Sequence, residues 1–383
     1  MSKSAKVFLF IVIALILLVY FVTKKTSDSQ ESSWEELNTK AVELLEQGRY
    51  SEAAEVAEDA LRIAEKTFGA NHRNVATSLN NLALLYRKTN RLKEAEPLYK
   101  RALKIYEASL GKDHTEVATA LNNLALLYSK TNRLKEAEPL YERSLRIYES
   151  SFGKDHPDVA MALNNLAELY RETNRMKEAE PLYKRALKID EASLGKDHPN
   201  VAIRLNNLVV LYLATNRLEE AEPLIERALK IHEASLGKDH PDVARDLISL
   251  AALYKATNRL EEAEPLYERA LKVLEASYGK DHPEVAIALS NLAILYGQTD
   301  RLKEAESLMK RALKIDEDSL GEDHPKVAIR LNNLAGLYEE TNRLKEAEPL
   351  YRRALKIFEE SFGPDHPNTT QVRENLEALL QDL

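Results

Sequence analysis

A unit of 42 residues recurs along most of this 383-residue chain, and its frame hardly slips. The segment 79–86, Leu-Asn-Asn-Leu-Ala-Leu-Leu-Tyr, returns unchanged at 121–128. A fixed period of this length is typical of a solenoid, in which each unit packs only on its neighbours. The expected function is therefore binding along an extended surface, rather than chemistry in a buried pocket.

Each unit has the pattern of two antiparallel helices. In the unit 74–115, apolar residues recur at helical spacing from Val75 to Tyr86 and again from Leu92 to Ile105. Asn90 lies between the two patterns, and asparagine tolerates the left-handed conformation that ends many helices. Gly111 is expected to end the second helix. The fold class is therefore predicted to be all-α.

The apolar framework of this unit resembles the tetratricopeptide repeat (TPR), a helix pair with small and aromatic residues at fixed positions. The residues that carry the resemblance are Leu79, Leu82, Ala83, Tyr86, Ala95, Tyr99 and Ala102. The longer period and the motifs Asn-Leu-Ala-x-Leu-Tyr, Glu-Ala-Glu-Pro-Leu and Leu-Gly-Lys-Asp-His-Pro resemble the kinesin light chain type of TPR. This resemblance covers about 72–367 and implies a superhelical solenoid that binds proteins or peptides. The long heptad region of kinesin light chains is missing, so no role beside a motor is implied.

The repeat frame predicts the domain organisation. We expect eight TPR units over 34–367, starting near residues 34, 74, 116, 158, 200, 242, 284 and 326, and a C-terminal capping helix at 368–383. A proline recurs at residues 97, 139, 181, 223, 265 and 349, beyond the first turn of the second helix. Because proline lacks the amide hydrogen, that helix is expected to start late or to bend at the proline.

The N-terminal segment differs from the rest of the chain. Val7 to Val22 contains no charge, proline or glycine, and a helix over 5–23 is just long enough to cross a bilayer. A cleaved secretory signal is the alternative, but its apolar core is usually shorter and followed by small residues. We expect a transmembrane signal-anchor at 5–23, a polar linker at 24–33, and a single-pass membrane protein whose repeats lie outside the cytoplasm, in the periplasm if the cell is bacterial.

Bulk composition narrows the partners. The net charge of −8 disfavours nucleic acid as a partner, because binding to the phosphate backbone needs clustered cations. The chain contains no cysteine, which excludes disulfides and thiolate sites. It shows no phosphate-binding glycine loop, nucleophile elbow or paired metal-ligand motif, so we expect neither an enzyme nor a cofactor.

Nine histidines raise the question of a metal site. Eight of them recur every 42 residues, at His72, His114, His156, His198, His240, His282, His324 and His366. Equivalent positions in stacked repeats should lie about 10 Å apart, given the usual distance between packed helices, which is far too wide for a shared ion with bonds of about 2 Å. We expect these histidines to be helix N-caps, with the proline that follows most of them at the first helical position. The ninth, His232, is expected on the surface.

By the TPR resemblance, the first helices of the pairs line a concave groove. An asparagine amide can donate and accept at once, so a ladder of asparagines can hold a peptide backbone whatever its side chains are. The alternative is that the amides bond locally or to the next repeat. The predicted peptide-binding asparagines are Asn81, Asn123, Asn165, Asn207, Asn291 and Asn333, with weaker candidates at Asn122, Asn164 and Asn206.

Other groove positions vary while the framework repeats. The predicted apolar contacts are Leu84, Leu126, Val210 and Ile294, and the predicted basic contacts are Arg87, Lys88, Lys130 and Arg171. The groove is therefore expected to be basic near its N-terminal end, apolar around Ile203, Val210 and Leu213, and acidic at its C-terminal end. Apolar side chains on a polar surface are typical of a partner site.

Two functions remain open at this point. The favoured one is a membrane-tethered scaffold that holds extended segments of partner proteins in the groove without catalysis. The alternative is a structural repeat protein that associates with itself and organises a membrane complex. The expected partners are proteins or peptides, and the membrane through the N-terminal helix.

Overall fold

The computed structural model describes residues 31–382, apart from 46 and 48. Every regular element in this part of the chain is a helix, so the predicted all-α solenoid is confirmed. Contacts divide the chain into two compact units, 1–151 and 152–383, and each is described by itself. The division into eight TPR units and a cap at 368–383 stays a prediction. Residues 31–33, expected in the linker, are the first residues of helix α1.

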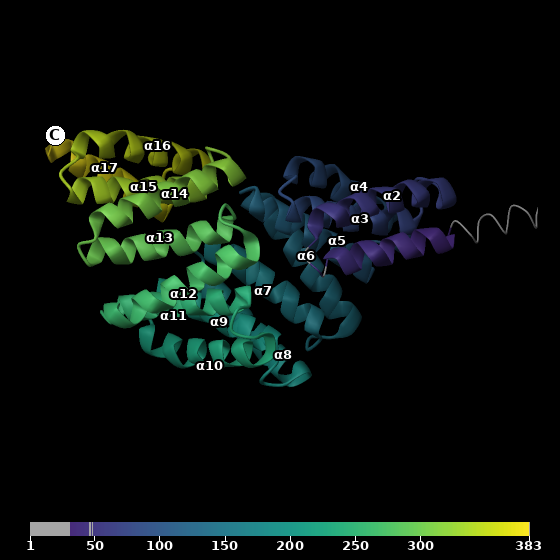
Figure 1. Ribbon diagram of the computed structural model, residues 1–383. Coiled ribbons are helices and arrows are strands. Elements are labelled where there is room, and N and C mark those ends of the chain that lie inside the picture. The colour runs from purple at the N-terminus through teal and green to yellow at the C-terminus, as the bar shows by residue number, and fades with distance from the viewer. Residues whose placement is uncertain (1–30, 46, 48, 383) are drawn as a thin grey trace, which may run out of the picture. The chain divides into compact units, whose positions relative to one another are not determined.

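The helices alternate between two lengths (Figure 1). We call the odd-numbered helices A helices and the even-numbered ones B helices. The first unit contains α1 (31–45), α2 (Tyr50–Phe68), α3 (Arg73–Lys88), α4 (Leu92–Leu110), α5 (Thr115–Lys130) and α6 (Leu134–Phe152), whose last residue belongs to the second unit.

The second unit continues the alternation and ends on an A helix that has no B partner after it. It contains α7 (Pro157–Glu172), α8 (Met176–Leu194), α9 (Pro199–Ala214), α10 (Leu218–Leu236), α11 (Pro241–Ala256), α12 (Leu260–Tyr278), α13 (Pro283–Gln298), α14 (Leu302–Leu320), α15 (Pro325–Glu340), α16 (Leu344–Phe362) and α17 (Pro367–Asp382).

The ends of the helices follow from single residues. The side chain of His156 accepts a hydrogen bond from the Asp158 amide at 3.2 Å, which satisfies one of the free amides of α7. The same contact caps the A helices at the other seven repeating histidines. Asn90, between α3 and α4, has a φ of 61°, and Gly111, after α4, has a φ of 90°. The predicted caps and helix ends are therefore confirmed.

The expectation of a late start for the B helices is wrong. Helix α4 begins at Leu92, and Pro97 lies inside it. Pro97 is exposed, so water can reach the backbone groups that lose their bond to a proline nitrogen. Arg91, just before α4, ends the turn with its own amide bonded to the Tyr86 carbonyl at 2.7 Å, which fixes the helix start ahead of the proline.

Small and aromatic residues hold each helix pair together. Ala83 and Ala95 are fully buried and allow α3 and α4 to approach closely, while Tyr86 and Tyr99 are buried at the same interface. At the N-terminal end, Trp34 is buried and donates a hydrogen bond to the hydroxyl of Ser78 at 2.8 Å. Trp34 therefore covers the end of the first unit's core.

Two arginines per repeat connect neighbouring pairs, and the sequence analysis did not identify them. Arg143 of α6 bonds the carboxylate of Glu107 at 2.6 Å and the carbonyl of Lys112 at 2.8 Å, so it joins a B helix to the preceding loop. Arg133, in the turn before α6, stacks over the Tyr128 ring at 3.9 Å and pairs with Glu96. Both contacts recur in later repeats.

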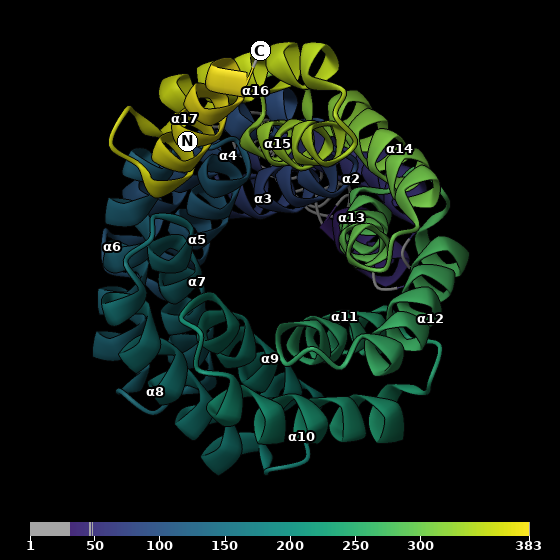
Figure 2. The same cartoon turned by 90° about the vertical axis from the view of Figure 1, so that its left-hand side faces the viewer.

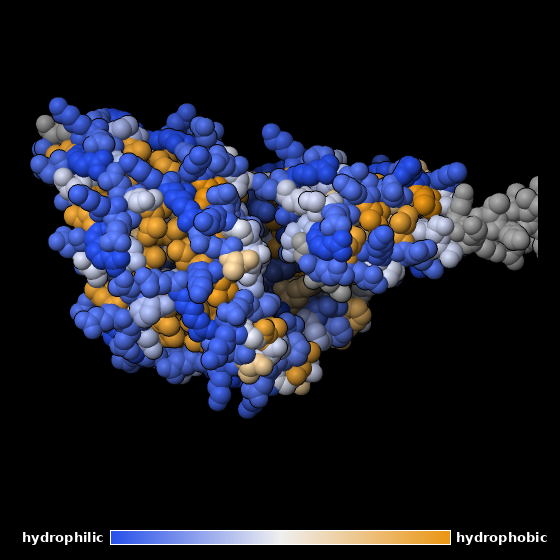
Figure 3. Space-filling model, in the orientation of Figure 1, coloured by the Kyte–Doolittle hydropathy of each residue, from blue (hydrophilic) through white to orange (hydrophobic). Residues whose placement is uncertain are grey.

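The expected localisation as a single-pass membrane protein is contradicted. Across the described part of the chain, no helix is both long enough and apolar enough to span a bilayer. The B helices reach 19 residues, but each carries charged residues along one face. Hydrophilic side chains also cover much of the face drawn in Figure 3. The expected anchor at 5–23 and most of the linker lie outside the described residues.

Candidate binding surface

The A helices form the inner side of the second unit (Figure 2). Consecutive A helices from α7 to α15 contact one another directly, whereas no comparable contact joins consecutive B helices. Helices that touch on one side and diverge on the other produce a curved stack with the A helices inside. In the first unit α3 and α5 also contact each other. The exposed face of the A helices is therefore the candidate binding surface.

The asparagines form bonds between successive A helices. Asn123 donates from Nδ2 to Oδ1 of Asn80 at 3.0 Å, and Asn207 donates to Asn164 at 2.7 Å. The same bond joins Asn81 to Asn38 and Asn375 to Asn332, while Asn291 instead bonds the carbonyl of Ile287 at 3.1 Å. The ladder therefore has an architectural use, and its contact with a peptide stays a prediction.

The other predicted contacts lie on the same face. Leu84, Leu126, Val210 and Ile294 are half-buried. Lys130 donates to the carbonyl of Arg87 at 3.3 Å, which connects α5 to α3. Ile203, at 37%, is among the few large apolar side chains of the described residues that are more than a third exposed. Whether a partner uses these positions is not determined by the fold.

Charges are concentrated at the C-terminal end of α7. Arg171 is ion-paired with Glu168, and Glu168 also accepts a hydrogen bond from the hydroxyl of Tyr183 at 2.6 Å. Burial and the Glu168 charge raise the pKa of Glu172 to about 7. The ammonium of Lys326, on α15, favours the charged form of both carboxylates. This part of the surface is thus mixed in sign rather than basic.

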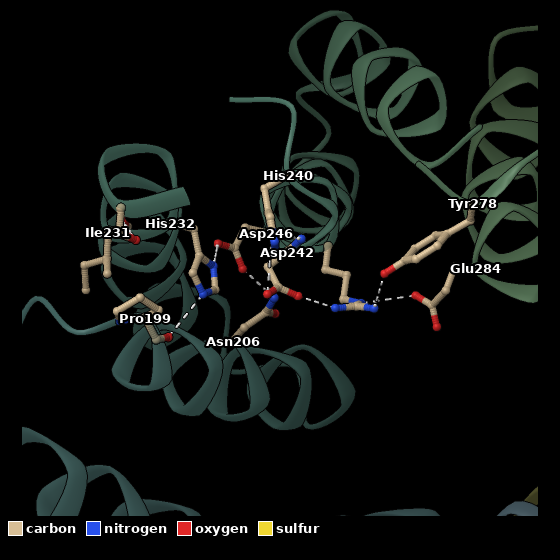
Figure 4. Close-up of polar contacts among 11 residues, drawn as sticks. Pro199, Asn206, Ile231, His232, His240, Asp242, Asp246, Tyr278 and Glu284 are labelled. Atoms are coloured by element: carbon tan, nitrogen blue, oxygen red, sulfur yellow. Dashed lines mark hydrogen bonds and ion pairs between the residues drawn. The ribbon is translucent and has the colours of Figure 1, made fainter. Parts of the chain in front are cut away.

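His232 is not on the surface, contrary to the expectation from the sequence. It is 1% exposed, on α10, and its Nδ1 lies 2.6 Å from the Asp246 carboxylate of α11 (Figure 4). Its Nε2 lies 3.1 Å from the carbonyl of Pro199. Asn206 of α9 donates to the other oxygen of Asp246 at 2.7 Å, and Ser249 donates to Asn206 at 2.7 Å. One polar network therefore joins α9, α10 and α11.

The network holds a proton between His232 and Asp246. The Pro199 carbonyl can only accept, so Nε2 must carry a hydrogen, and the short Nδ1–carboxylate contact needs a second one. Burial lowers the pKa of His232, but the hydrogen bond and charge of Asp246 outweigh it, and the net shift is upward. Burial also raises the pKa of Asp246. The pair is best described as an imidazolium bonded to a carboxylate.

Similar buried pairs occupy the equivalent position in two other repeats. Arg204 bonds Asp190 at 2.8 Å, and Arg330 bonds Asp316 at 2.9 Å. In each pair the B-helix residue precedes its A-helix partner by 14 residues, as in His232 and Asp246. The sequence contained this signal: Asp–Arg, His–Asp and Asp–Arg replace the pairing of Tyr148 with Ala162 or of Leu274 with Ala288 at the same spacing.

Nothing in this geometry resembles a catalytic or metal centre. In the part of the chain that the structure describes, no group of three or more histidine, cysteine, aspartate or glutamate side chains could hold a metal ion. The repeating histidines lie at separate helix starts, and several stack on an aromatic ring, such as His156 on Phe152 at 4.3 Å.

The repeats can now be compared with known families. Overlapping segments that together run from 37 to 383 match the tetratricopeptide repeat family. The chain is a TPR protein. The fold of this TPR protein is one that is used for protein–protein interaction. No curated protein matches the chain.

Three solved structures are similar to this TPR protein. BtubC (BKLC) from P. vanneervenii is 28% identical, with a TM-score of 0.48 over 64% of this chain and 92% of that one. A kinesin light chain with nearly identical TPR-like repeats from Podosopora anserina is 24% identical, with a TM-score of 0.45 over 54% and 98%. A Rap protein complexed with Competence and Sporulation Factor is 14% identical, with a TM-score of 0.60 over 92% and 98%, which shows a shared fold.

Proposed function

We propose that the protein is a non-catalytic scaffold that binds extended segments of partner proteins along the exposed face of its A helices. The observation that carries the proposal is the contrast between two sets of A-helix positions. The buried set is nearly invariant, as in Leu79, Leu121 and Leu163, all fully buried. The half-exposed set changes from repeat to repeat, as in Leu126, Glu168 and Val210.

Such a contrast is what a binding surface on a repeat scaffold needs. The invariant residues keep the units stacked, and the variable ones give each unit its own contact with a ligand. On α9, Ile203 and Val210 are seven residues apart and therefore share one face of the helix. Partly exposed apolar side chains on a polar surface favour an extended partner with apolar side chains at matching intervals. The family membership supports the same conclusion.

The test is to select peptides from a random display library on the full chain and on two variants. The double change Ile203→Glu with Val210→Glu places two charges on the proposed surface. The control is Leu380→Glu, because Leu380 is equally exposed, at 43%, but lies on α17. We expect the wild type and the control to retain the same peptides and the double variant to lose them. Retention by all three would place the site elsewhere, and a folded chain that selects no peptide would contradict the proposal.

A separate comparison tests the asparagines. Asn207→Ala removes one predicted peptide contact together with its bond to Asn164. We expect weaker peptide retention together with a modest loss of stability, and thermal melting separates the two effects. Melting that changes while retention stays constant would leave the ladder with its architectural role alone.

A further inference from the structure

One carboxylate on the A-helix face is held by two donors of its own chain. In α7 and α8, the hydroxyl of Tyr183 donates to Glu168 at 2.6 Å, and Arg171 forms an ion pair with the same carboxylate. Tyr183 is fully buried, while Glu168 and Arg171 are half-buried on the A-helix face. A phenol and a cation therefore meet a carboxylate where the B helix reaches through to the binding surface.

Two repeats further on, the same donors are present but the carboxylate is missing. Counting 84 residues forward, Tyr267 takes the place of Tyr183, Lys255 that of Arg171, and Ala252 that of Glu168. The hydroxyl of Tyr267 is buried and has no hydrogen-bond partner. Burial alone lowers the pKa of Lys255, with no contribution from a carboxylate. A buried phenol without an acceptor and a half-buried ammonium without a counter-ion are both costly.

The other tyrosines of this row show why the Tyr267 position differs. Tyr351 donates to Glu339 at 2.9 Å, and the hydroxyl of Tyr141 is 3.5 Å from that of Ser129. Tyr99 also has a hydroxyl without a partner, but the residue in the place of Glu168 is there Leu84, which is bulky. Among the described repeats with this tyrosine, Ala252 and Gly336 are the residues small enough to leave that place open, and Tyr351 beside Gly336 already has its acceptor.

We propose that Ala252, Lys255 and Tyr267 form a subsite for the carboxylate of an acidic side chain in a bound segment. The arriving carboxylate would take the position that Glu168 occupies two repeats earlier, accept the phenol hydrogen and pair with the ammonium. The neighbouring A helices α9 and α13 present Val210 and Ile294 at the position of Ala252. The preferred segment therefore carries an acidic residue between apolar ones. This inference rests on the proposed function and adds a specificity to it.

The binding test uses two pools of 12-residue peptides, random except for a central glutamate in one pool and glutamine in the other. We expect the full chain to retain the glutamate pool at least tenfold better. Tyr267→Phe and Lys255→Gln should each reduce this ratio while leaving retention of the glutamine pool unchanged. Ala252→Glu should abolish the ratio, because it supplies the carboxylate from within the chain, and the size-matched Ala252→Gln should interfere less.

A second measurement does not depend on any peptide. If the geometry is as described, Ala252→Glu completes the arrangement seen at Glu168, and the variant should melt about 2 °C or more above Ala252→Gln. Equal melting temperatures would overturn the subsite. Equal retention of the two pools by the wild type would also overturn it while leaving the proposed function intact. Failure to retain either pool would overturn both.

Discussion

The junctions between repeats are built differently in the two units. In the first unit, Tyr106 on α4 and Tyr148 on α6 share hydrogen bonds with Thr77 and Thr119 at 2.9 and 2.8 Å, so the contact is aromatic with one hydroxyl pair. In the second unit, three of the equivalent B-helix positions carry Asp190, His232 and Asp316, each buried and paired with a charge 14 residues later. The helices stack in the same way in both units.

The comparison shows that the fold requires a matched pair at this position rather than an apolar one. A buried ion pair rarely adds stability over a well-packed apolar pair, but a half-removed pair is very costly. The second unit is therefore expected to be more sensitive to single substitutions at its junctions, although its intact stability need not be higher.

The largest effect is expected from Asp246→Ala. The change leaves the His232 imidazolium buried without its partner and removes the acceptor of Asn206, so the free energy of unfolding should fall by roughly 3–5 kcal/mol. The double variant His232→Leu with Asp246→Ala copies the pairing of Leu274 with Ala288 and should recover most of the loss. Urea denaturation of the full chain, followed by circular dichroism, measures both. A single variant as stable as the double variant would remove the distinction between the units.

A smaller effect is expected from pH. The pKa of His232 is raised in the folded chain above its unfolded value of about 6.5, so the stabilisation is complete below that pH and is lost as pH rises through the folded pKa. Asp242, which also faces His232, adds to this upward shift. The raised pKa of Asp246 acts with the same sign, because the folded state again binds more protons. The urea midpoint of the wild type should fall between pH 6.5 and 9 relative to that of the double variant, and parallel curves would contradict the proton-sharing pair.

The sequence predicted the fold well because the fold depends on local, repeated signals. Asn90, Gly111 and His156 act through their own backbone positions, and each recurs every 42 residues, so one correct interpretation extends along the chain. The site was harder to predict. His232 was placed on the surface because its helix was considered alone, and its partner Asp246 lies on another helix. The Tyr267 hydroxyl could not be recognised as unpaired until its neighbours were placed.

The smallest effect is expected at the helix caps, where the two units do not differ. His114 in the first unit and His198 in the second each accept a bond from a backbone amide, at 3.2 and 3.1 Å. Asparagine can accept the same bond, so His114→Asn and His198→Asn should each change the free energy of unfolding by less than about 0.5 kcal/mol, whereas alanine at either position should cost about 1 kcal/mol. Thermal melts with and without EDTA complete the measurement. A cap function predicts equal small changes in both units and no response to the chelator, so a large drop with EDTA in the wild type that the asparagine variants lack would show that the histidines bind metal.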